Sequence, residues 1–385
     1  MEFIALLLVI GVVVWIQNQL FSKFSFRKLD YRCYLSTEEA TEGDEIQLIE
    51  EIVNRKWLPV PWFKSEITTS CYLDFAGAQS SVADKTRFVP SFFSVRGYRK
   101  LNRSWKVTCL KRGEYAVQKV VLVSSDLLGN SLLSQPAQVD SHVLVLPKPL
   151  ELETEFCCPR YYSGDVVVRR RLLEDPFWLA GVQEYTGREA MNRIHWAATA
   201  KEQKMMVHHQ ECTSSQNVAV ILNIQSRAFE NTEVIDQDYV EDAIRVCAAV
   251  FEQTATEQLP LRFFANASLW DDRSSIAVGE SWGREYILEL YRILARIPLK
   301  STQNFPDYLN ELYDRTDATD FVLVTAYVCP EIYEFARRKT AMGSHVKIFV
   351  TGKIDNSQLV DDCEVFCLDS RFQPEQEKGG VEYAV

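Results

Sequence analysis

The sequence lacks an excess of positive charge and lacks regularly spaced cysteines. Its 42 lysines and arginines are outnumbered by 53 aspartates and glutamates, which gives a formal net charge of -11. Because duplex binding depends on clustered basic residues that neutralise phosphates, this balance argues against nucleic acid as a general partner. The 10 cysteines include no CxxC pair, so neither a zinc site nor a disulfide scaffold is indicated, and reduced thiols are favoured.

Metal-binding and catalytic motifs are also missing from the segments that carry histidine. There is no HExxH, and His208 and His209 are adjacent, which places them on opposite faces of a strand. His195 could act as a general base, but no nucleophile motif is recognised to pair with it. We therefore predict no catalytic residue, no metal and no cofactor, and a protein that binds rather than catalyses.

One long apolar run is present, at the N-terminus. Phe3 to Phe21 is uncharged over about 19 residues, enough to cross a bilayer core of about 30 Å. Lys23, Arg27 and Lys28 all follow the run, and the positive-inside rule then places the bulk of the chain in the cytoplasm. We expect a single-pass transmembrane helix at residues 1–22 in the cell membrane. A cleaved signal peptide is the alternative, disfavoured because no basic residue precedes the run and no small-x-small site follows it.

Residues 31–149 form short alternating runs separated by turn residues. This pattern predicts an antiparallel β-sandwich. The prolines between Trp57 and Trp62 predict an irregular edge or loop, since proline lacks the N–H that a central strand needs. Aromatic side chains near these tryptophans either pack within the core and loops or form a patch that binds a partner.

The period of the sequence changes after this region. Continuous apolar runs, such as residues 216–224, alternate with segments that repeat apolar residues at helical spacing, such as 239–253. This alternation predicts a doubly wound α/β domain at residues 212–370. A connector at 150–211 precedes the domain, and a polar, flexible tail at 371–385 follows it.

The connector contains the most distinctive segment of the chain, Gly181 to Glu211. Its Ile-His-Trp triplet, the tyrosine before it and the Thr-Ala-Lys after it resemble the signature of the domain-of-unknown-function family number 58. The arginine and glycine-aspartate positions of that signature differ here. The candidate residues of the signature segment are Tyr185, Glu189, Arg193, His195, Trp196 and Lys201.

The resemblance implies a fold and a partner. It implies a von Willebrand factor A-like (Rossmann-like) second half, and a bacterial-type membrane protein that works with a MoxR-type AAA+ ATPase in protein assembly or maturation. On this basis the chain is a membrane-anchored cytoplasmic binding or scaffold protein, an adaptor for that ATPase. The alternative is a hydrolase or metal-dependent enzyme that uses His195, Glu189 and Arg193. We favour a His195 that fixes its loop by hydrogen bonds.

The resemblance also implies a crevice. The family fold holds a metal at Asp-x-Ser-x-Ser after its first strand and at an aspartate after a later strand, where this chain has Asn-Ile-Gln-Ser-Arg and Thr-Ala. Hard cations need anionic oxygens, so we predict a crevice without metal. Either Arg227 offers positive charge to a partner's carboxylate, or the polar side chains only hydrogen-bond the loop. The crevice candidates are Asn223, Gln225, Ser226, Arg227 and Thr325.

Overall fold

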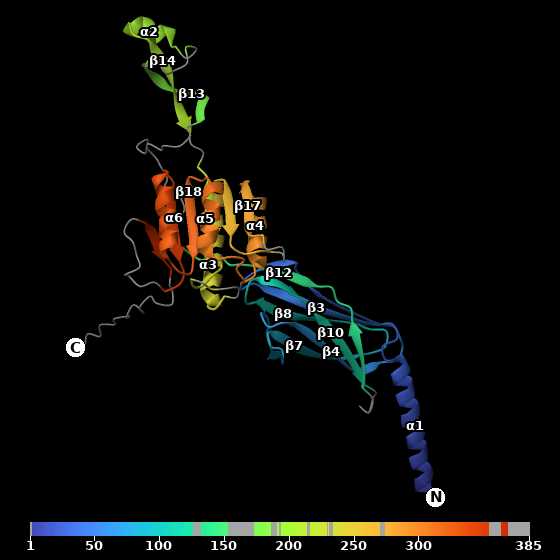
Figure 1. Cartoon of the computed structure of the whole chain (residues 1–385). Coiled ribbons are helices and arrows are strands. Elements are labelled where there is room, and N and C mark those ends of the chain that lie inside the picture. The colour runs from blue at the N-terminus through green and yellow to red at the C-terminus, as the bar shows by residue number, and fades with distance from the viewer. Residues whose placement is uncertain are drawn as a thin grey trace, which may run out of the picture. The chain divides into compact units, whose positions relative to one another are not determined.

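An N-terminal β-sandwich is followed by a mixed α/β domain with a largely parallel sheet, in agreement with the order predicted from the sequence (Figure 1). The chain divides into two units, Met1–Leu150 with Leu288–Ile297 and Glu151–Ile287 with Pro298–Val385. The structure is a computed structural model, and the residues that it describes are 2–125, 132–152, 173–185, 191, 194–213, 216–228, 230, 234–269, 274–353 and 363–368.

Helix α1 (Glu2–Phe24) begins the first unit and covers the segment in which the sequence predicts a transmembrane helix, residues 1–22. Large apolar side chains of α1 are exposed, among them Phe3 at 78% and Leu8 at 66%. Among the residues that the structure describes, no helix is long and apolar enough to cross a membrane.

The C-terminal end of α1 is attached to the sandwich by polar contacts. The buried Lys56 ammonium donates to the carbonyl oxygens of Phe24 and Ser25. The Ser25 and Ser124 hydroxyls lie 2.5 Å apart. A cation at the C-terminal carbonyls of a helix satisfies acceptors that have no partner within the helix. The end of α1 therefore has a defined place on the sandwich.

Two antiparallel sheets form the sandwich, in the orders β1-β3-β8-β5 and β11-β10-β4-β7-β6. Alternate residues of their strands are buried, and these meet in one core between the sheets. The strands are β1 (Leu29–Leu35), β3 (Glu45–Asn54), β4 (Val60–Ser70), β5 (Leu73–Phe75), β6 (Ser81–Ala83), β7 (Thr86–Val95), β8 (Lys100–Cys109), β10 (Lys119–Ser125) and β11 (Leu132–Ala137).

A third, small sheet departs from the all-antiparallel prediction. It has the order β2-β12-β9, and β2 pairs in parallel with β12. Parallel neighbours need a long connection, and here nearly the whole sandwich separates the two strands in sequence. The strands are β2 (Glu39–Thr41), β9 (Gly113–Ala116) and β12 (His142–Leu146).

The prediction of an irregular segment from Trp57 to Trp62 is wrong for its second half. Strand β4 begins at Val60, includes Pro61, and is flanked on both sides by other strands. The register of β4 with β7 shifts between Val60 and Phe63. At such an irregularity a ladder hydrogen bond is already missing, so a proline without an N–H is tolerated.

The second unit contains a six-stranded sheet in the order β17-β16-β15-β18-β19-β20, in which only β17 is antiparallel to its neighbour. Every residue of β15 and β18 is buried, as expected for strands covered on both faces. If the six strands are numbered from 1 to 6 along the chain, their order in the sheet is 3-2-1-4-5-6, and the order reverses between β15 and β18. The strands are β15 (Val218–Leu222), β16 (Leu261–Ala265), β17 (Ile276–Ser281), β18 (Asp320–Thr325), β19 (His345–Val350) and β20 (Glu364–Cys367).

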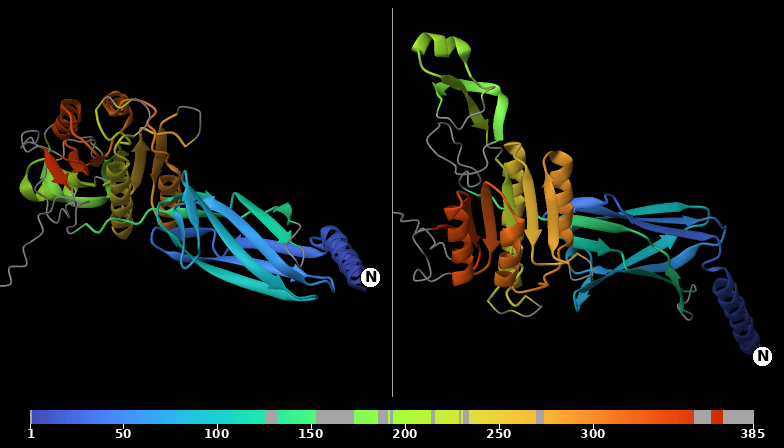
Figure 2. Two further views of the ribbon diagram at one scale, coloured as in Figure 1. Left: turned by 90° about the horizontal axis from the view of Figure 1, so that it is seen from below. Right: turned by 45° about the horizontal axis from the view of Figure 1, so that its top comes forward.

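Helices cover both faces of this sheet (Figure 2). The face that carries Ala219 and Ile221 packs against α5 (Phe305–Arg315) and α6 (Pro330–Ala341). On the other face, α3 (Gln237–Thr256) packs Phe251 edge-on against Phe263 of β16. Helix α4 (Arg284–Arg296) follows β17. The predicted alternation of strands and helices is confirmed.

A buried lysine joins α5 to α6. The Lys339 ammonium of α6 donates to the carbonyl oxygens of Tyr313 (2.8 Å) and Thr316 (2.6 Å), at the C-terminal end of α5. The rings of Tyr313, Phe321 and Phe335 surround it at 4.7, 5.0 and 5.9 Å. Cation–π contact and carbonyl acceptors together compensate a buried charge.

The connector predicted at residues 150–211 contains an antiparallel pair, β13 (Leu173–Glu184) and β14 (Met206–Thr213), with the short helix α2 (Trp196–Glu202) between them in sequence. The predicted tail, 371–385, lies outside the described residues.

Candidate functional site

Neutral polar side chains meet beyond the carboxyl ends of β15 and β18. The Asn223 amide nitrogen donates to Thr325 Oγ1 (3.0 Å), and the Asn266 amide nitrogen donates to Asn223 Oδ1 (3.2 Å). Asn266 Oδ1 accepts from the backbone N–H of Ile224 (2.7 Å). All three side chains are completely buried. Adjacent parallel strands end at the same edge of a sheet, which is why Asn223 and Thr325 are brought together as predicted.

Gln225 extends this network toward α5. Its amide nitrogen donates to the Glu230 carbonyl oxygen (2.7 Å) and to Asn304 Oδ1 (3.3 Å). Its amide oxygen accepts from the backbone N–H of Phe305 (2.8 Å) and the Tyr327 hydroxyl (3.4 Å). Both ends of the amide are therefore used within the protein.

Ser226 binds a carboxylate that the sequence patterns did not single out. The Ser226 backbone N–H and hydroxyl donate to the two oxygens of the buried Glu230, at 2.6 and 2.8 Å. The Ile235 N–H donates to the same group at 2.5 Å. These donors leave Glu230 engaged in holding its own loop. Within the described part of the chain, no group of three or more His, Cys, Asp and Glu side chains is placed to hold a metal ion.

Arg227 points to a carboxylate of its own chain. Its guanidinium donates through Nε (2.9 Å) and Nη2 (2.7 Å) to Asp236 Oδ2. The positive charge that the sequence analysis offered to a partner's carboxylate is therefore already paired with Asp236 in this structure. The arginine side chain is 62% exposed, and exposed pairs contribute only about 0–1 kcal/mol, so a partner's carboxylate would have to compete with Asp236. The contacts of Asn223, Gln225 and Ser226 match the other hypothesis, that they hydrogen-bond the loop.

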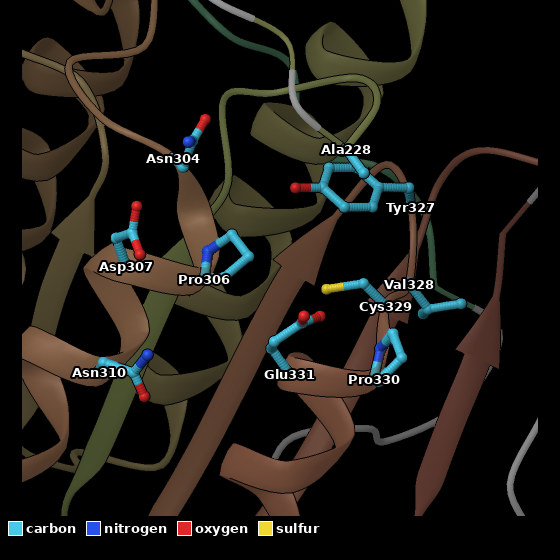
Figure 3. A pocket seen from close by; sticks show the side chains of 10 residues that line it. All are labelled: Ala228, Asn304, Pro306, Asp307, Asn310, Tyr327, Val328, Cys329, Pro330 and Glu331. Atoms are coloured by element: carbon cyan, nitrogen blue, oxygen red, sulfur yellow. The ribbon is translucent and has the colours of Figure 1, made fainter.

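A cavity of about 420 Å³ lies beside this network (Figure 3). Figure 3 shows the first residues of α5 on one side and the segment from Tyr327 to Glu331 on the other. Asp307 and Glu331 stand in the first turns of α5 and α6, where the helix dipole stabilises negative charge. The lining residues are Ala228, Asn304, Pro306, Asp307, Asn310, Tyr327, Val328, Cys329, Pro330 and Glu331.

The thiol and the phenol of this cavity are unsuited to nucleophilic chemistry. Burial, with a further contribution from Glu331, raises the pKa of Cys329 to about 11. Burial also raises the pKa of Tyr327 to about 12. Both groups are thus protonated at neutral pH, and a thiol is a weak nucleophile in that form. Sequence reasoning missed the cavity because its two walls are distant in sequence. The available signal was a proline at the start of each helix, Pro306 and Pro330.

The signature segment is separate in sequence from this crevice and forms its own small structure. The Ala198 N–H donates to His195 Nδ1 (3.0 Å), so His195 is the N-cap of α2, and the His195 N–H donates to the Met206 carbonyl oxygen (2.8 Å). These contacts agree with a histidine that fixes its loop. Trp196 is 71% exposed, and Lys201 is exposed.

The remaining signature candidates are partly placed. The Tyr185 N–H donates to the Met205 carbonyl oxygen (2.8 Å), which continues the ladder of β13 and β14. Glu189 and Arg193 lie outside the described residues. The enzymatic alternative with His195, Glu189 and Arg193 therefore stays a prediction.

One further pattern was not recognised from the sequence. Residues 279–283 read Gly-Glu-Ser-Trp-Gly, the pattern of a nucleophile elbow between a strand and a helix. Ser281 instead ends an antiparallel edge strand, where it pairs with Leu261 of β16. The backbone φ of Ser281 is not positive, so this serine lacks the strained backbone that exposes the serine of a nucleophile elbow. The structure thus gives this serine no catalytic geometry.

Comparison with known proteins finds distant likenesses of structure alone. No family model and no curated protein matches the chain. It is similar to a CARDB domain from Pyrococcus furiosus, at 12% identity over 31% of this chain and 96% of that one, with a TM-score of 0.20. A non-cellulosomal cohesin from Archaeoglobus fulgidus is 15% identical over 30% of this chain and 91% of its own, with a TM-score of 0.21. A chain of a Clostridium thermocellum cohesin-dockerin complex is 11% identical over 31% of this chain and 100% of its own, with a TM-score of 0.22. Likenesses this weak carry no argument about function.

Proposed function

We propose that this chain is a membrane-attached, non-catalytic binding protein with a metal-free von Willebrand factor A-like domain. It serves as an adaptor for a MoxR-type AAA+ ATPase in the assembly or maturation of other proteins, and the bulk of it lies in the cytoplasm. The observation that carries the proposal is the closed network of Asn223, Asn266 and Gln225. In the fold that the sequence resembles, carboxylates at this edge of the sheet hold a metal, and here neutral amides bind Thr325, the Glu230 carbonyl oxygen and, between Asn266 and Asn223, each other.

The strand order supports the von Willebrand factor A-like assignment. A sheet in the order 3-2-1-4-5-6, with its third strand antiparallel, places the ligand crevice at the switch point between β15 and β18. The network and the adjoining cavity both lie at this edge. The cavity has a mixed apolar and acidic lining, with protonated Tyr327 and Cys329, which suits recognition of a protein segment better than covalent chemistry.

Membrane attachment is proposed from the N-terminal sequence. The run from Phe3 to Phe21 is apolar, and the basic residues Lys23, Arg27 and Lys28 follow it. Burial of the exposed apolar side chains of α1 in lipid would remove them from water, at about 25 cal/mol for each Å².

Crosslinking and purification from native membranes test the partnership. The full chain and a Glu331→Lys variant are compared, because reversal of this charge places a cation in the cavity. Glu334→Lys is the matched control: it lies on the same helix and is exposed, and it does not line the cavity. We expect an AAA+ ATPase, identified by mass spectrometry, with the parent and with Glu334→Lys, and its loss with Glu331→Lys.

Two other outcomes contradict the proposal in different ways. Equal recovery of the ATPase with Glu331→Lys would exclude the cavity as its docking site. Absence of an AAA+ ATPase from every purification, with the chain itself recovered intact, would reject the partnership. Arg227→Glu in the same series shows whether the crevice loop contributes, since it breaks the pair with Asp236.

A further inference from the structure

The end of the β-sandwich that holds α1 differs from the rest of the molecule in its exposed side chains. Trp57 is 70% exposed, Trp62 is 61% exposed and Tyr98 is 71% exposed. Large aromatic side chains gathered at one place in water are costly unless a partner covers them. Tryptophan and tyrosine are also the residues that concentrate at the headgroup level of membranes.

Backbone contacts place these aromatic residues next to α1. The Tyr98 N–H donates to the carbonyl oxygen of Lys56 (3.0 Å), the residue whose ammonium binds the end of α1. A side chain at Gly97 would come within 2.3 Å of the Trp57 carbonyl oxygen, so the two loops are closely packed. Trp62 pairs with Ser125, the neighbour of the serine that contacts Ser25.

Basic residues surround the aromatic group at the same end. Asn54 holds Arg96 and Arg99 at this end through their backbone. Its N–H donates to the Arg99 carbonyl oxygen (2.9 Å), and its side-chain amide donates to the Arg96 carbonyl oxygen (3.1 Å). The Arg55 N–H donates to the Lys28 carbonyl oxygen (2.9 Å). Arg55 pairs with Asp30, whereas none of the described acidic residues forms an ion pair with Lys28, Arg96 or Arg99.

The other end of the sandwich carries exposed charges of both signs, because Lys85 and Lys119 lie there with several carboxylates. Strand β3 runs from Asn54 at the α1 end to Glu45 at the far end, about 30 Å away at about 3.3 Å per residue. Exposed Glu38, Glu39 and Asp44 lie at that far end, around the start of β3. The basic end is therefore a local feature of a protein whose net charge is -11.

We propose that the α1 end of the sandwich is a lipid-binding surface that takes the anionic headgroups of a bilayer, with Trp57, Trp62 and Tyr98 at headgroup depth and Lys28, Arg96 and Arg99 facing phosphate. Charge complementarity and continuity with α1 favour a bilayer over an acidic protein. The inference rests on the proposed membrane attachment through α1. It adds that the folded sandwich itself contacts the lipid, which sets its orientation on the membrane.

The test uses the full chain reconstituted in nanodiscs of phosphatidylcholine, with or without phosphatidylglycerol. Amide hydrogen exchange of residues 55–62 and 95–100 reports the contact locally, whatever α1 does. We expect exchange there to be at least about fivefold slower in the anionic nanodiscs. The double variant Arg96→Glu, Arg99→Glu should lose this protection. The control Lys85→Glu, Lys119→Glu reverses two exposed charges at the far end of β4 and β7 and should keep it.

The outcomes separate this inference from the proposed function. If the chain does not co-elute with nanodiscs, membrane attachment through α1 fails, and the inference fails with it. If it co-elutes but the exchange of both segments is the same with and without anionic lipid, attachment stands and the lipid-binding surface is rejected. Equal loss of protection in the control variant would also reject it, because the effect would then follow from net charge alone.

Discussion

Replacement of Glu50 tests how the two sheets of the sandwich are joined. This carboxylate of β3 is completely buried and accepts hydrogen bonds from both sheets. From its own sheet, Tyr31 (2.8 Å) and Trp105 (2.9 Å) donate to it. From the opposite sheet, Ser65 (2.5 Å) and Ser91 (2.8 Å) do so. Burial, followed by Cys33 and Glu50, raises the pKa of Tyr31 well above its usual value, so the phenol remains a donor.

The expected cost follows from these four bonds. Bonds to a charged group contribute about 1.5–3 kcal/mol each, and removal of one member of a buried charged network costs about 3–5 kcal/mol. Glu50→Ala should therefore destabilise the first unit by about 3–5 kcal/mol. In Glu50→Gln the amide oxygen can still accept from Trp105 and Ser91, and the hydroxyls of Tyr31 and Ser65 can turn to accept from the NH₂ group, but the bonds are then to a neutral group and are weaker. That variant should cost about 1–3 kcal/mol.

Opening free energies from amide hydrogen exchange of β3 and β4, measured on the full chain, provide the assay. Trp105→Phe removes a bond that is stronger to the carboxylate than to the amide, so the double variant with Glu50→Gln should lose less stability than the sum of the single changes. Glu45→Gln is the control, because this residue of the same strand forms an exposed pair with Lys106 and should cost under about 1 kcal/mol. The reasoning is refuted if Glu50→Ala costs no more than the control, or if the double variant is simply additive.

Three further predictions concern other parts of the chain. Lys339→Met should destabilise the second unit by about 1–3 kcal/mol, seen as faster exchange in α5, because the last carbonyl oxygens of that helix lose their donor; unchanged exchange would contradict this. Gly352→Ala should destabilise the carboxyl edge of the sheet, since its new methyl group would lie 2.0 Å from the Ala326 carbonyl oxygen. An unfolding temperature equal to that of the parent protein would refute this prediction. Burial lowers the pKa of Lys56 to about 8, so competitive labelling of its amine should show a midpoint near pH 8 instead of the ordinary 10.5. Because the unfolded chain keeps this proton up to about pH 10.5, the lysine's contribution to stability should rise from pH 8 to 10.5 and stay flat below.

Local sequence was sufficient to predict most of the strands and helices of the α/β domain, although α5 and the β13–β14 pair were not predicted. Strand β3 alternates buried and exposed residues, and α3 repeats its apolar residues at helical spacing. A few consecutive residues are therefore enough to predict which face of each element is buried. The neutral polar residues Asn223, Gln225 and Thr325 at the ends of two strands could also be predicted, because the end of a strand can be located from its apolar run. Proline in β4 misled the prediction, since a bulge that removes the need for an N–H is not visible in sequence.

What the sequence by itself determined is therefore the order of the elements and the chemical character of the residues at their ends. Only the tertiary structure decided what those residues do. The Asn223 and Thr325 partners are 102 residues apart, and Glu50 accepts a hydrogen bond from Trp105, which is 55 residues away. The positive charge of Arg227 could be predicted from the sequence, but its pairing with Asp236 could not. Such contacts depend on which elements become neighbours, and that is a property of packing, not of local pattern.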